Sequence, residues 1–371
     1  MNKIILTIFL IIILAASANA KTDNHMKRVL AHSDAQVASA VKDGCLRVLQ
    51  TQGLTALNCM PQTAAKLGLQ DDVKVYAVDT AANAQIQATR VQSIGNKGAG
   101  QKIVILDTGY NYNHPELKSS YLGGWDFVNN DSDPMDDNGH GSHVAGLITG
   151  DGVMNGALGV APSTGIISGK VLDASGTGYF SDVIAGIYWA VNGPDGKFGT
   201  KDDFKPAAIS LSLGTSPPYT YSAYCDDVMP DMTAAINYAR SKNVLVVVAA
   251  GNSGSSGVGL PGCITNATTV AAVDASNKTA SFSGVGKAVD IAAPGVGLFS
   301  AWLGTDYMYA SGTSMATPMV TGTIALIKAK HPNYTATQVE NALFNTAKDL
   351  GQKGKDKYYG YGLVNAYLAA R

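Results

Sequence analysis

Charged residues are scarce in this sequence of 371 residues: they make up 15% of the chain, and the formal net charge is −1. A nucleic-acid-binding protein needs a clustered excess of Lys and Arg, so this composition excludes that class of partner. After the first twenty residues no apolar run approaches the length of a membrane span, and no internal repeat or linker divides the region after residue 86. What remains, with 46% hydrophobic residues and 41 glycines, is typical of a compact, loop-rich globular enzyme.

Residues 1–20 have the three parts of a secretory signal peptide. Lys3 supplies the positive start, residues 4–14 supply the apolar stretch, and Ala18-Asn19-Ala20 supplies a cleavage site of small residues. The apolar stretch is short for a membrane span, and an uncleaved anchor is the alternative interpretation. We therefore expect a secreted protein without stable membrane association.

A small module with mixed strand and helix patterns occupies residues 21–82. The patterns predict strands at 28–30, 46–49 and 73–78, and helices at 33–41 (capped by Ser33 or Asp34) and 61–67. These short elements predict an α+β fold that is separate from the rest of the chain.

From residue 86 onward, apolar strand patterns alternate with helical patterns. Strands are predicted at 103–106, 166–171, 208–212, 244–249 and 269–273, and helices at 140–148, 182–191, 232–241, 314–329 and 337–346. Alternation at this spacing predicts a parallel sheet that is covered by helices on both faces. We therefore expect one α/β domain over residues 83–371.

Four polar side chains stand at the ends of these elements. Asp107 ends one apolar strand, Asn252 follows another, and His140 and Ser314 each open a helix. The carboxyl ends of parallel strands form the edge where sites are built, and a helix start favours developing negative charge. A serine in that place can be a nucleophile if a base is near, although on its own Ser314 could simply cap its helix.

The stretches around these residues closely resemble the motifs of the subtilisin-like serine proteases, or subtilases. The matching stretches are Asp107-Thr108-Gly109, His140 to Gly146, Ser212-Leu213-Gly214, Ala250-Gly251-Asn252 and Gly312 to Pro318. The resemblance implies a subtilisin-like fold and a secreted serine endopeptidase that acts through an acyl-enzyme. It makes Ser314 the nucleophile, His140 the general base and Asp107 the residue that orients His140. The side chain of Asn252 and the backbone N–H of Ser314 are then the expected donors to the oxyanion.

The resemblance also makes residues 21–82 a propeptide that assists folding and inhibits the cleft until it is removed near residues 80–85. A retained N-terminal domain is the alternative. The mature enzyme is expected to be a monomer that acts on polypeptides.

An extended substrate is expected to lie between two segments of the chain, as in other subtilases. The residues expected at the substrate are Gly176, Thr177, Gly178, Ser212, Leu213, Gly214, Ala250, Gly251 and Gly259. None of them is charged, which predicts a roomy neutral pocket for a large apolar residue before the scissile bond.

Two acidic loops are candidate Ca²⁺ sites, because dense oxygen ligands suit a hard cation. The first resembles a calcium loop of thermitase-like subtilases, and its expected ligands are Asp126, Asn129, Asp131, Asp133 and the carbonyl of Met135. The second resembles a calcium-binding insertion of some archaeal subtilases, with Asp195, Asp202 and Asp203 as expected ligands. For both loops the alternative is a solvated acidic turn.

Four cysteines allow three pairings in an exported protein. We favour Cys45–Cys59 and Cys225–Cys263, because the first two belong to the segment that the resemblance implies is removed; free buried thiols are the alternative.

His143 follows His140 by three residues, but no Glu or third ligand accompanies the pair, so a structural role is expected rather than metal binding. An α/β-hydrolase esterase needs the chain order Ser, Asp, His, which this chain does not have. A pseudoprotease would lack a catalytic residue, and all of them are present.

Overall fold

The computed structural model describes residues 26–51, 53–72, 81–152 and 156–371. The signal peptide and the strand predicted at 73–78 lie outside these residues. The chain divides into two compact units, Met1–Val75 and Tyr76–Arg371, which are described separately below.

The N-terminal unit is a four-stranded antiparallel sheet with two helices. Its elements are β1 (Lys27–Ala31), α1 (Asp34–Lys42), β2 (Leu46–Thr51), β3 (Leu54–Cys59), α2 (Pro61–Lys66) and β4 (Gln70–Asp71), with strand order β2-β3-β1-β4. Ser33 caps α1, since its hydroxyl accepts the N–H of Gln36 at 3.2 Å. The disulfide Cys45–Cys59 joins the residue before β2 to the end of β3, which confirms the predicted pairing. The unit also has its own buried core, around Val29 and Leu57.

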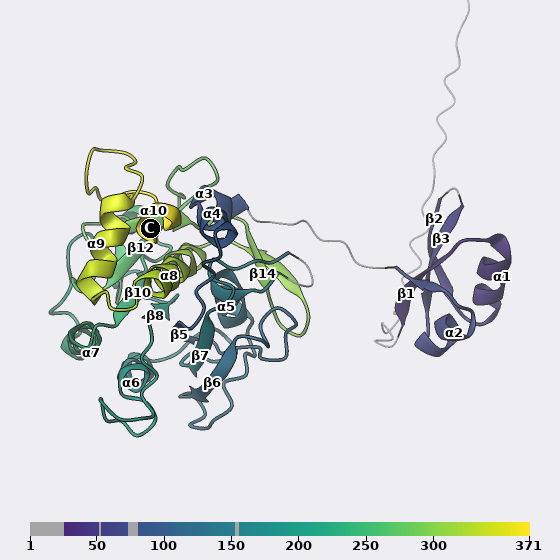
Figure 1. The fold of residues 1–371 in the computed structure, drawn as a ribbon, viewed down its shortest axis with the longest axis horizontal. Coiled ribbons are helices and arrows are strands. Elements are labelled where there is room, and N and C mark those ends of the chain that lie inside the picture. Colours follow the sequence, from purple (N-terminus) through teal and green to yellow (C-terminus); the bar gives the residue numbers. More distant parts are fainter. Residues whose placement is uncertain (1–25, 52, 73–80, 153–155) are drawn as a thin grey trace, which may run out of the picture. The chain divides into compact units, whose positions relative to one another are not determined.

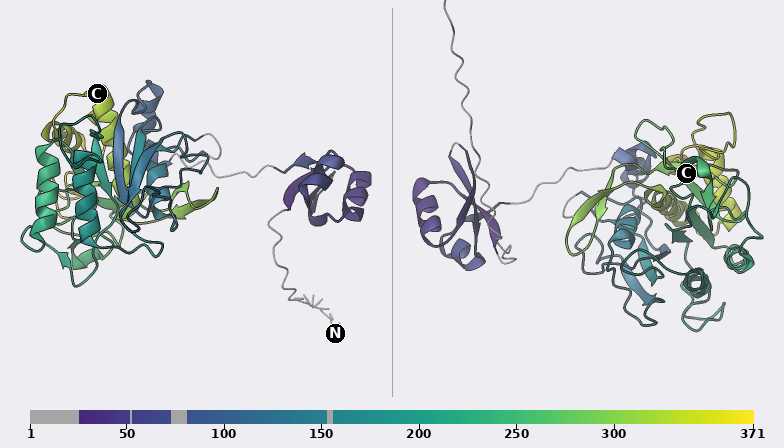
Figure 2. Two further views of the ribbon diagram at one scale, coloured as in Figure 1. Left: turned by 90° about the horizontal axis from the view of Figure 1, so that it is seen from below. Right: turned by 180° about the vertical axis from the view of Figure 1, so that it is seen from behind.

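The C-terminal unit is built on a seven-stranded sheet with strand order β13-β12-β10-β8-β5-β7-β6. The strands are β5 (Lys102–Asp107), β6 (Tyr121–Asp126), β7 (Gly165–Lys170), β8 (Ala208–Leu211), β10 (Leu245–Ala249), β12 (Thr268–Val273) and β13 (Ile291–Pro294). Neighbouring strands pair in parallel throughout. The central strands are buried along their length because helices cover both faces of the sheet, as Figure 2 shows, and the α/β prediction is confirmed.

The longer helices lie in two groups. α5 (His140–Thr149) and α8 (Thr313–Lys330) pack together on one face, whereas α6 (Phe180–Asn192) and α7 (Pro230–Ser241) pack together on the other. The remaining helices are α3 (Ala81–Gln85), α4 (Ala88–Ser93), α9 (Ala336–Thr346) and α10 (Ala366–Ala369), with a 3₁₀ turn at Gly254–Ser256. Two antiparallel ribbons complete the unit: β9 (Thr220–Tyr221) with β11 (Val258–Gly259), and β14 (Leu298–Ala301) with β15 (Tyr307–Ala310).

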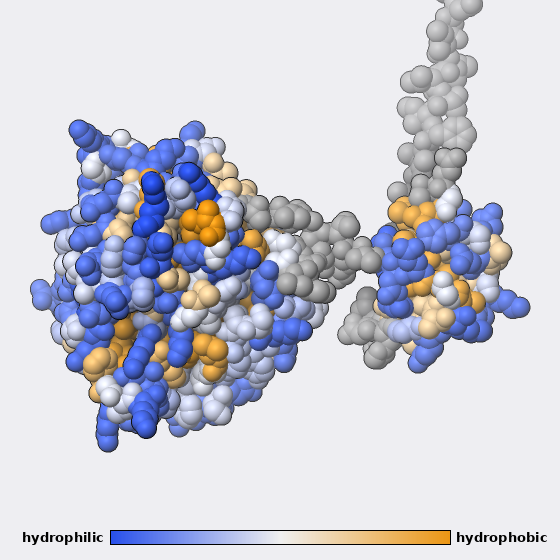
Figure 3. Space-filling view, in the orientation of Figure 1, coloured by the Kyte–Doolittle hydropathy of each residue, from blue (hydrophilic) through white to orange (hydrophobic). Residues whose placement is uncertain are grey.

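No helix among the described residues is long and apolar enough to cross a membrane. On the face seen in Figure 3, hydrophobic residues form small separate patches among hydrophilic ones.

Candidate active site

The carboxyl edge of the sheet brings Asp107 and His140 together. Asp107 is the last residue of β5 and is buried, and His140 is the first residue of α5. The Oδ1 atom of Asp107 lies 2.6 Å from Nδ1 of His140 and also accepts the N–H of Thr108 at 2.7 Å. Its other oxygen is buried with no hydrogen-bond partner in the described part of the chain. Burial lowers the pKa of His140, but the charge of Asp107 and its hydrogen bond outweigh that effect, so the pKa stands above its ordinary value.

Asp136 fixes the position of the first turn of α5, and the sequence analysis did not identify it. Its carboxylate accepts the hydroxyl of Thr108 at 2.8 Å, the N–H of Gly139 at 2.9 Å, and both the N–H and the hydroxyl of Ser142 at 2.8 and 2.6 Å. Burial raises the pKa of Asp136, but hydrogen bonds to the backbone and to Ser142 hold the pKa below its ordinary value. One carboxylate thus ties the residue after Asp107 to the helix that begins with His140.

Ser314 lies in the first turn of α8, where Pro318 leaves one carbonyl without its usual partner. Proline has no N–H, so the Ser314 carbonyl accepts the hydroxyl of Ser212 at 2.8 Å instead. The hydroxyl of Ser314 in turn donates to the carbonyl of Ser212 at 3.0 Å rather than to His140. These reciprocal bonds fix the serine against the segment that follows β8.

Asn252 is oriented by its neighbour in space, Thr313. The side-chain oxygen of Asn252 accepts the N–H of Thr313 at 2.9 Å and its hydroxyl at 3.0 Å. The oxygen is therefore occupied, and the NH₂ group is the part of the amide left to donate to a ligand.

One cleft of about 540 Å³ contains His140, Ser314 and Asn252 in its lining. Of the predicted substrate residues, it is lined by Gly176, Thr177, Gly178, Ser212, Leu213, Gly214 and Gly251. Ala250, predicted in the wall, and Gly259, predicted near the base of the pocket, are not among the residues that line this cleft, and both are buried. The N–H of Gly259 donates to the carbonyl of Ala250 at 3.0 Å, and a side chain at Gly259 would meet the backbone of Thr215.

The cleft has apolar lining that the motifs did not reveal. Leu172, Tyr179, Phe180 and Val183 line it, and no Asp, Glu, Lys or Arg is among its lining residues. Thr108, Asn138, Ser175, Thr215, Ser216, Ala249 and Thr313 complete the lining. The Tyr179-Phe180 pair directly follows Gly178, so the nearest available sequence signal was two aromatic residues beside a substrate motif.

His143 is fully buried in α5, as expected for a structural residue. Its Nε2 lies 3.1 and 3.0 Å from the carbonyls of Leu298 and Met308, and burial lowers its pKa to about 4. The ring is therefore neutral at pH 7 and donates from Nε2 to this carbonyl pair.

The carboxylates of the acidic loops accept hydrogen bonds within the turns of these loops. Asp126 accepts the N–H groups of Val128 and Asn129 at 2.7 and 2.9 Å, and Asp131 and Asp133 each accept an N–H two residues on. Across the described ranges, no group of three or more His, Cys, Asp or Glu side chains is arranged to hold a metal ion. The structure therefore leaves both calcium sites as predictions.

A parallel α/β unit with a buried carboxylate on a histidine, and a helix-start serine in the same cleft, defines the class of α/β serine hydrolases. Within that class, residues 98–362 match the model of the subtilase family. The chain is 40% identical to subtilisin DY of Bacillus licheniformis over 291 residues, covering 77% of this chain and 96% of that protein. It is 41% identical to subtilisin Savinase of Lederbergia lenta over 287 residues, covering 77% and 97%. An alkaline protease of Shouchella clausii is also 41% identical over 287 residues, covering 77% and 68%.

The chain therefore belongs to the subtilase family, and the protein is a serine-type endopeptidase.

Proposed function

We propose that this endopeptidase cleaves polypeptides after large apolar residues, with Ser314 as nucleophile, His140 as base and Asp107 as the residue that orients the base. The observation that supports the proposal best is the 2.6 Å contact between Asp107 and His140 beside a cleft that also contains Ser314.

The reaction begins when the Ser314 hydroxyl turns from the Ser212 carbonyl towards Nε2 of His140. As the serine oxygen bonds to the substrate carbonyl carbon, its proton passes to Nε2. Asp107 accepts a hydrogen bond from the N–H at Nδ1, so it selects the tautomer that leaves Nε2 free, and it stabilises the imidazolium that forms.

The tetrahedral intermediate places its negative charge near two donors. The NH₂ of Asn252 and the N–H of Ser314 at the start of α8 stabilise this charge. A side-chain donor in this place accounts for about 10²- to 10³-fold in kcat, an effect already established for subtilisin itself.

The intermediate breaks down by cleavage of the C–N bond. His140 returns its proton to the departing amine, and the acyl group stays on Ser314. Water then loses a proton to His140 and attacks the ester, which releases the acid and restores the serine hydroxyl.

Apolar residues before the scissile bond fit the cleft because its lining is neutral and includes Leu172, Tyr179 and Phe180. Burial of an apolar side chain there contributes to binding in proportion to the area removed from water. The extended backbone of the substrate pairs with the segments around Gly176 and Leu213.

Residues 21–82 act as a propeptide that inhibits the cleft until it is removed, and residues 1–20 direct export. In support, the N-terminal unit is a compact body with its own sheet, core and disulfide.

Calcium is proposed as a structural ion at the second loop in preference to the first. Asp195, Asp202 and Asp203 all lie within hydrogen-bonding distance of the Thr200 hydroxyl, at 3.4, 2.5 and 3.4 Å, so the three carboxylates surround one side chain and would have to rearrange to hold an ion. Asp126 in the first loop is buried, and its oxygens accept three N–H bonds from their own turn. A hard cation at the second loop would neutralise the mutual repulsion of its carboxylates.

Substitution Ser314→Ala tests the assignment of the nucleophile. We expect the variant to keep its fold but to lose casein hydrolysis, and a serine-directed covalent inhibitor to label Ser314 in the wild type. Casein hydrolysis by the pure variant above the rate of a mock preparation would refute the proposal.

A further inference from the structure

One wall of the cleft includes residues 212–216, and the loop that carries them rests on a second loop that is not among the lining residues. One loop follows β8 and includes Thr215; the other follows Asn252 and includes Gly259. They meet in the β9–β11 ribbon, which pairs only Thr220 with Gly259 and Tyr221 with Val258. A ribbon of two residue pairs is far below the size at which strands are stable without other support.

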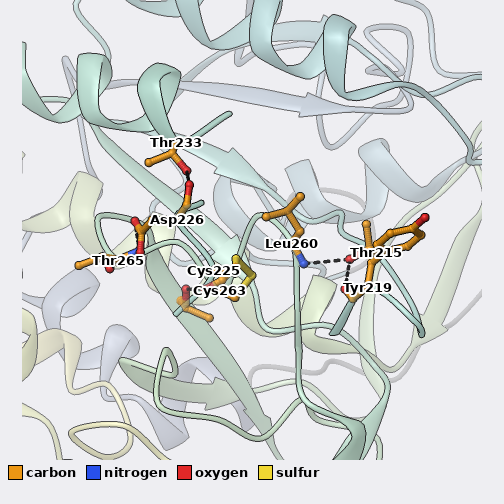
Figure 4. The surroundings of a disulfide bond; sticks show 10 residues. Thr215, Tyr219, Cys225, Asp226, Thr233, Leu260, Cys263 and Thr265 are labelled. Atoms are coloured by element: carbon orange, nitrogen blue, oxygen red, sulfur yellow. Dashed lines mark hydrogen bonds between the residues drawn. A yellow bond between two sulfur atoms is a disulfide. The ribbon is translucent and has the colours of Figure 1, made fainter. Parts of the chain in front are cut away.

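Thr215 connects this ribbon to the cleft. Its N–H donates to the carbonyl of Leu260 at 2.9 Å, and its hydroxyl accepts the N–H of Leu260 at 2.9 Å. The same hydroxyl donates to the carbonyl of Tyr219 at 2.5 Å. Figure 4 shows these contacts on one side of a disulfide bond. Since Thr215 lines the cleft, the position of this wall depends on where the Leu260 loop stands.

The disulfide Cys225–Cys263 connects the two segments that follow the strands of the ribbon. Cys225 follows Tyr221 by four residues and Cys263 follows Gly259 by four, and both cysteines are buried. The N–H of Cys225 donates to the carbonyl of Cys263 at 3.1 Å, and the N–H of Cys263 donates to the carbonyl of Gly259 at 3.2 Å. The covalent bond therefore joins the segment that follows β9 to the segment that follows β11.

Beyond the disulfide, the first loop is anchored to the body of the unit. Asp226 accepts the N–H and the hydroxyl of Thr265 at 3.2 and 2.7 Å, and its carbonyl accepts the hydroxyl of Thr233 in α7 at 2.8 Å. Figure 4 shows both contacts. Because the disulfide links the two loops near this anchor, the position of α7 can help to fix the position of the cleft wall.

We propose that Cys225–Cys263 is a specificity clamp: it holds Thr215 and Gly259 at the spacing that lets the cleft select a large apolar residue before the scissile bond. The inference rests on the proposed function. The Asp107–His140 contact and the Asn252–Thr313 contacts involve neither loop, and the bonds between Ser212 and Ser314 lie where the first loop begins, directly after β8. Loss of the disulfide should therefore weaken recognition of the substrate side chain and leave the chemical step in place.

The test compares Cys225→Ala/Cys263→Ala with Cys45→Ala/Cys59→Ala, which removes the disulfide of the separate N-terminal unit. For each mature enzyme, kcat and KM are measured on peptide p-nitroanilides with Phe or Ala before the scissile bond, and on p-nitrophenyl acetate, which has no side chain for the pocket. In the first variant we expect the Phe-to-Ala ratio of kcat/KM to fall about tenfold, mainly through KM for Phe, with acetate hydrolysis unchanged. The mature control no longer contains the N-terminal unit and should keep the wild-type ratio, so it shows whether removal of a disulfide during folding alone changes the ratio.

An unchanged ratio in the active double variant would overturn the clamp, and so would an equal loss on all three substrates. If the double variant does not fold, folded wild-type enzyme is treated with dithiothreitol, which gives two electrons and two protons to the disulfide, leaves two thiols and becomes a cyclic disulfide itself. The thiols are alkylated until mass spectrometry finds both Cys225 and Cys263 modified. The Phe-to-Ala ratio of kcat/KM is then measured on this enzyme and read in the same way. A failure of the proposed function would give a different result. In that case the Ser314→Ala variant would still hydrolyse p-nitrophenyl acetate.

Discussion

The carboxylate of Asp136 holds both the backbone N–H and the hydroxyl of Ser142, at 2.8 and 2.6 Å, and through them the first turn of the helix that begins with His140. A carboxylate at this end of a helix satisfies N–H groups that have no partner inside the helix. The general base is therefore placed by a residue that does not touch it.

Replacement Asp136→Asn should lower kcat more than it changes KM. The amide has one acceptor oxygen instead of two, so some of the bonds from Thr108, Gly139 and Ser142 are lost, and stability should fall by about 1.5–3 kcal/mol. Thermal unfolding and steady-state kinetics measure both effects. Asp231→Asn, an exposed acid in the first turn of α7, is the matched control and should change neither. A rise in KM with normal kcat would contradict the positioning role.

Replacement Asp107→Asn should reduce kcat by about 10⁴-fold, the loss known for the same change in another serine protease. In the wild type, only neutral His140 can accept the serine proton, so kcat/KM should fall as pH drops through the pKa of His140. Asp107 holds that pKa above 6.5, and without its charge the remaining acid limb should move to lower pH. Profiles of kcat/KM between pH 4 and 10 test this; an acid limb at the same pH in both enzymes would assign the titration to another group.

His143 should make the fold less stable at acid pH. Its folded-state pKa is about 4, below 6.5, so the unfolded chain takes up a proton first as the pH falls. The contribution is complete above pH 6.5 and is lost between about pH 6.5 and 4, by up to about 3 kcal/mol. Urea unfolding in a Ser314→Ala background, which prevents autolysis, measures the slope. His143→Gln, which stays neutral and can still donate to the carbonyls, should flatten that part of the curve; an unchanged slope would exclude His143 as its source.

Chelation of calcium should lower the melting temperature without changing kcat per folded molecule. An ion that binds only the folded state stabilises it by about 2.7 kcal/mol at one hundred times its Kd. If the second loop holds the ion, Asp195→Ala/Asp202→Ala should abolish the chelator effect, and Asp131→Ala should preserve it. The opposite result would move the site to the first loop, and identical melting curves with and without chelator would remove both sites.

Maturation should depend on the nucleophile. We expect secreted wild-type protein to begin near residues 80–85, and Ser314→Ala to keep its N-terminal unit. N-terminal sequencing of both proteins decides, and equal termini would show that another protease makes the cut.

The sequence predicted the parallel sheet from local signals, and it marked the candidate site residues by their positions together with the resemblance to the subtilases. Apolar runs mark buried strands, and Asp107, His140, Asn252 and Ser314 each stand where an element ends or begins. Cys225–Cys263 was also predicted, since the other two cysteines lie in the segment that the resemblance makes a propeptide.

Other features depend on contacts that no local pattern encodes. β6 was missed because two glycines, Gly123 and Gly124, interrupt its apolar pattern, and β13 because it has two alanines and ends in a proline. Asp136 lies in an acidic loop, and composition cannot distinguish a carboxylate that ties a helix from one that binds a cation. Tyr179 and Phe180 belong to the cleft only because the chain turns there before α6 begins.

The burial of α8 has a consequence for how the enzyme loses activity. From Met315 to Ile327 every residue of this helix is buried, so solvent deuterium should reach its amides only when the whole unit opens. Ser314 stands at the start of the helix that we expect to exchange slowest, whereas the loops that carry Thr215 and Gly259 are joined by a ribbon of two residue pairs, a few further hydrogen bonds and a disulfide. At low denaturant concentration, the enzyme should therefore lose its selectivity between substrates before Ser314 loses its reactivity.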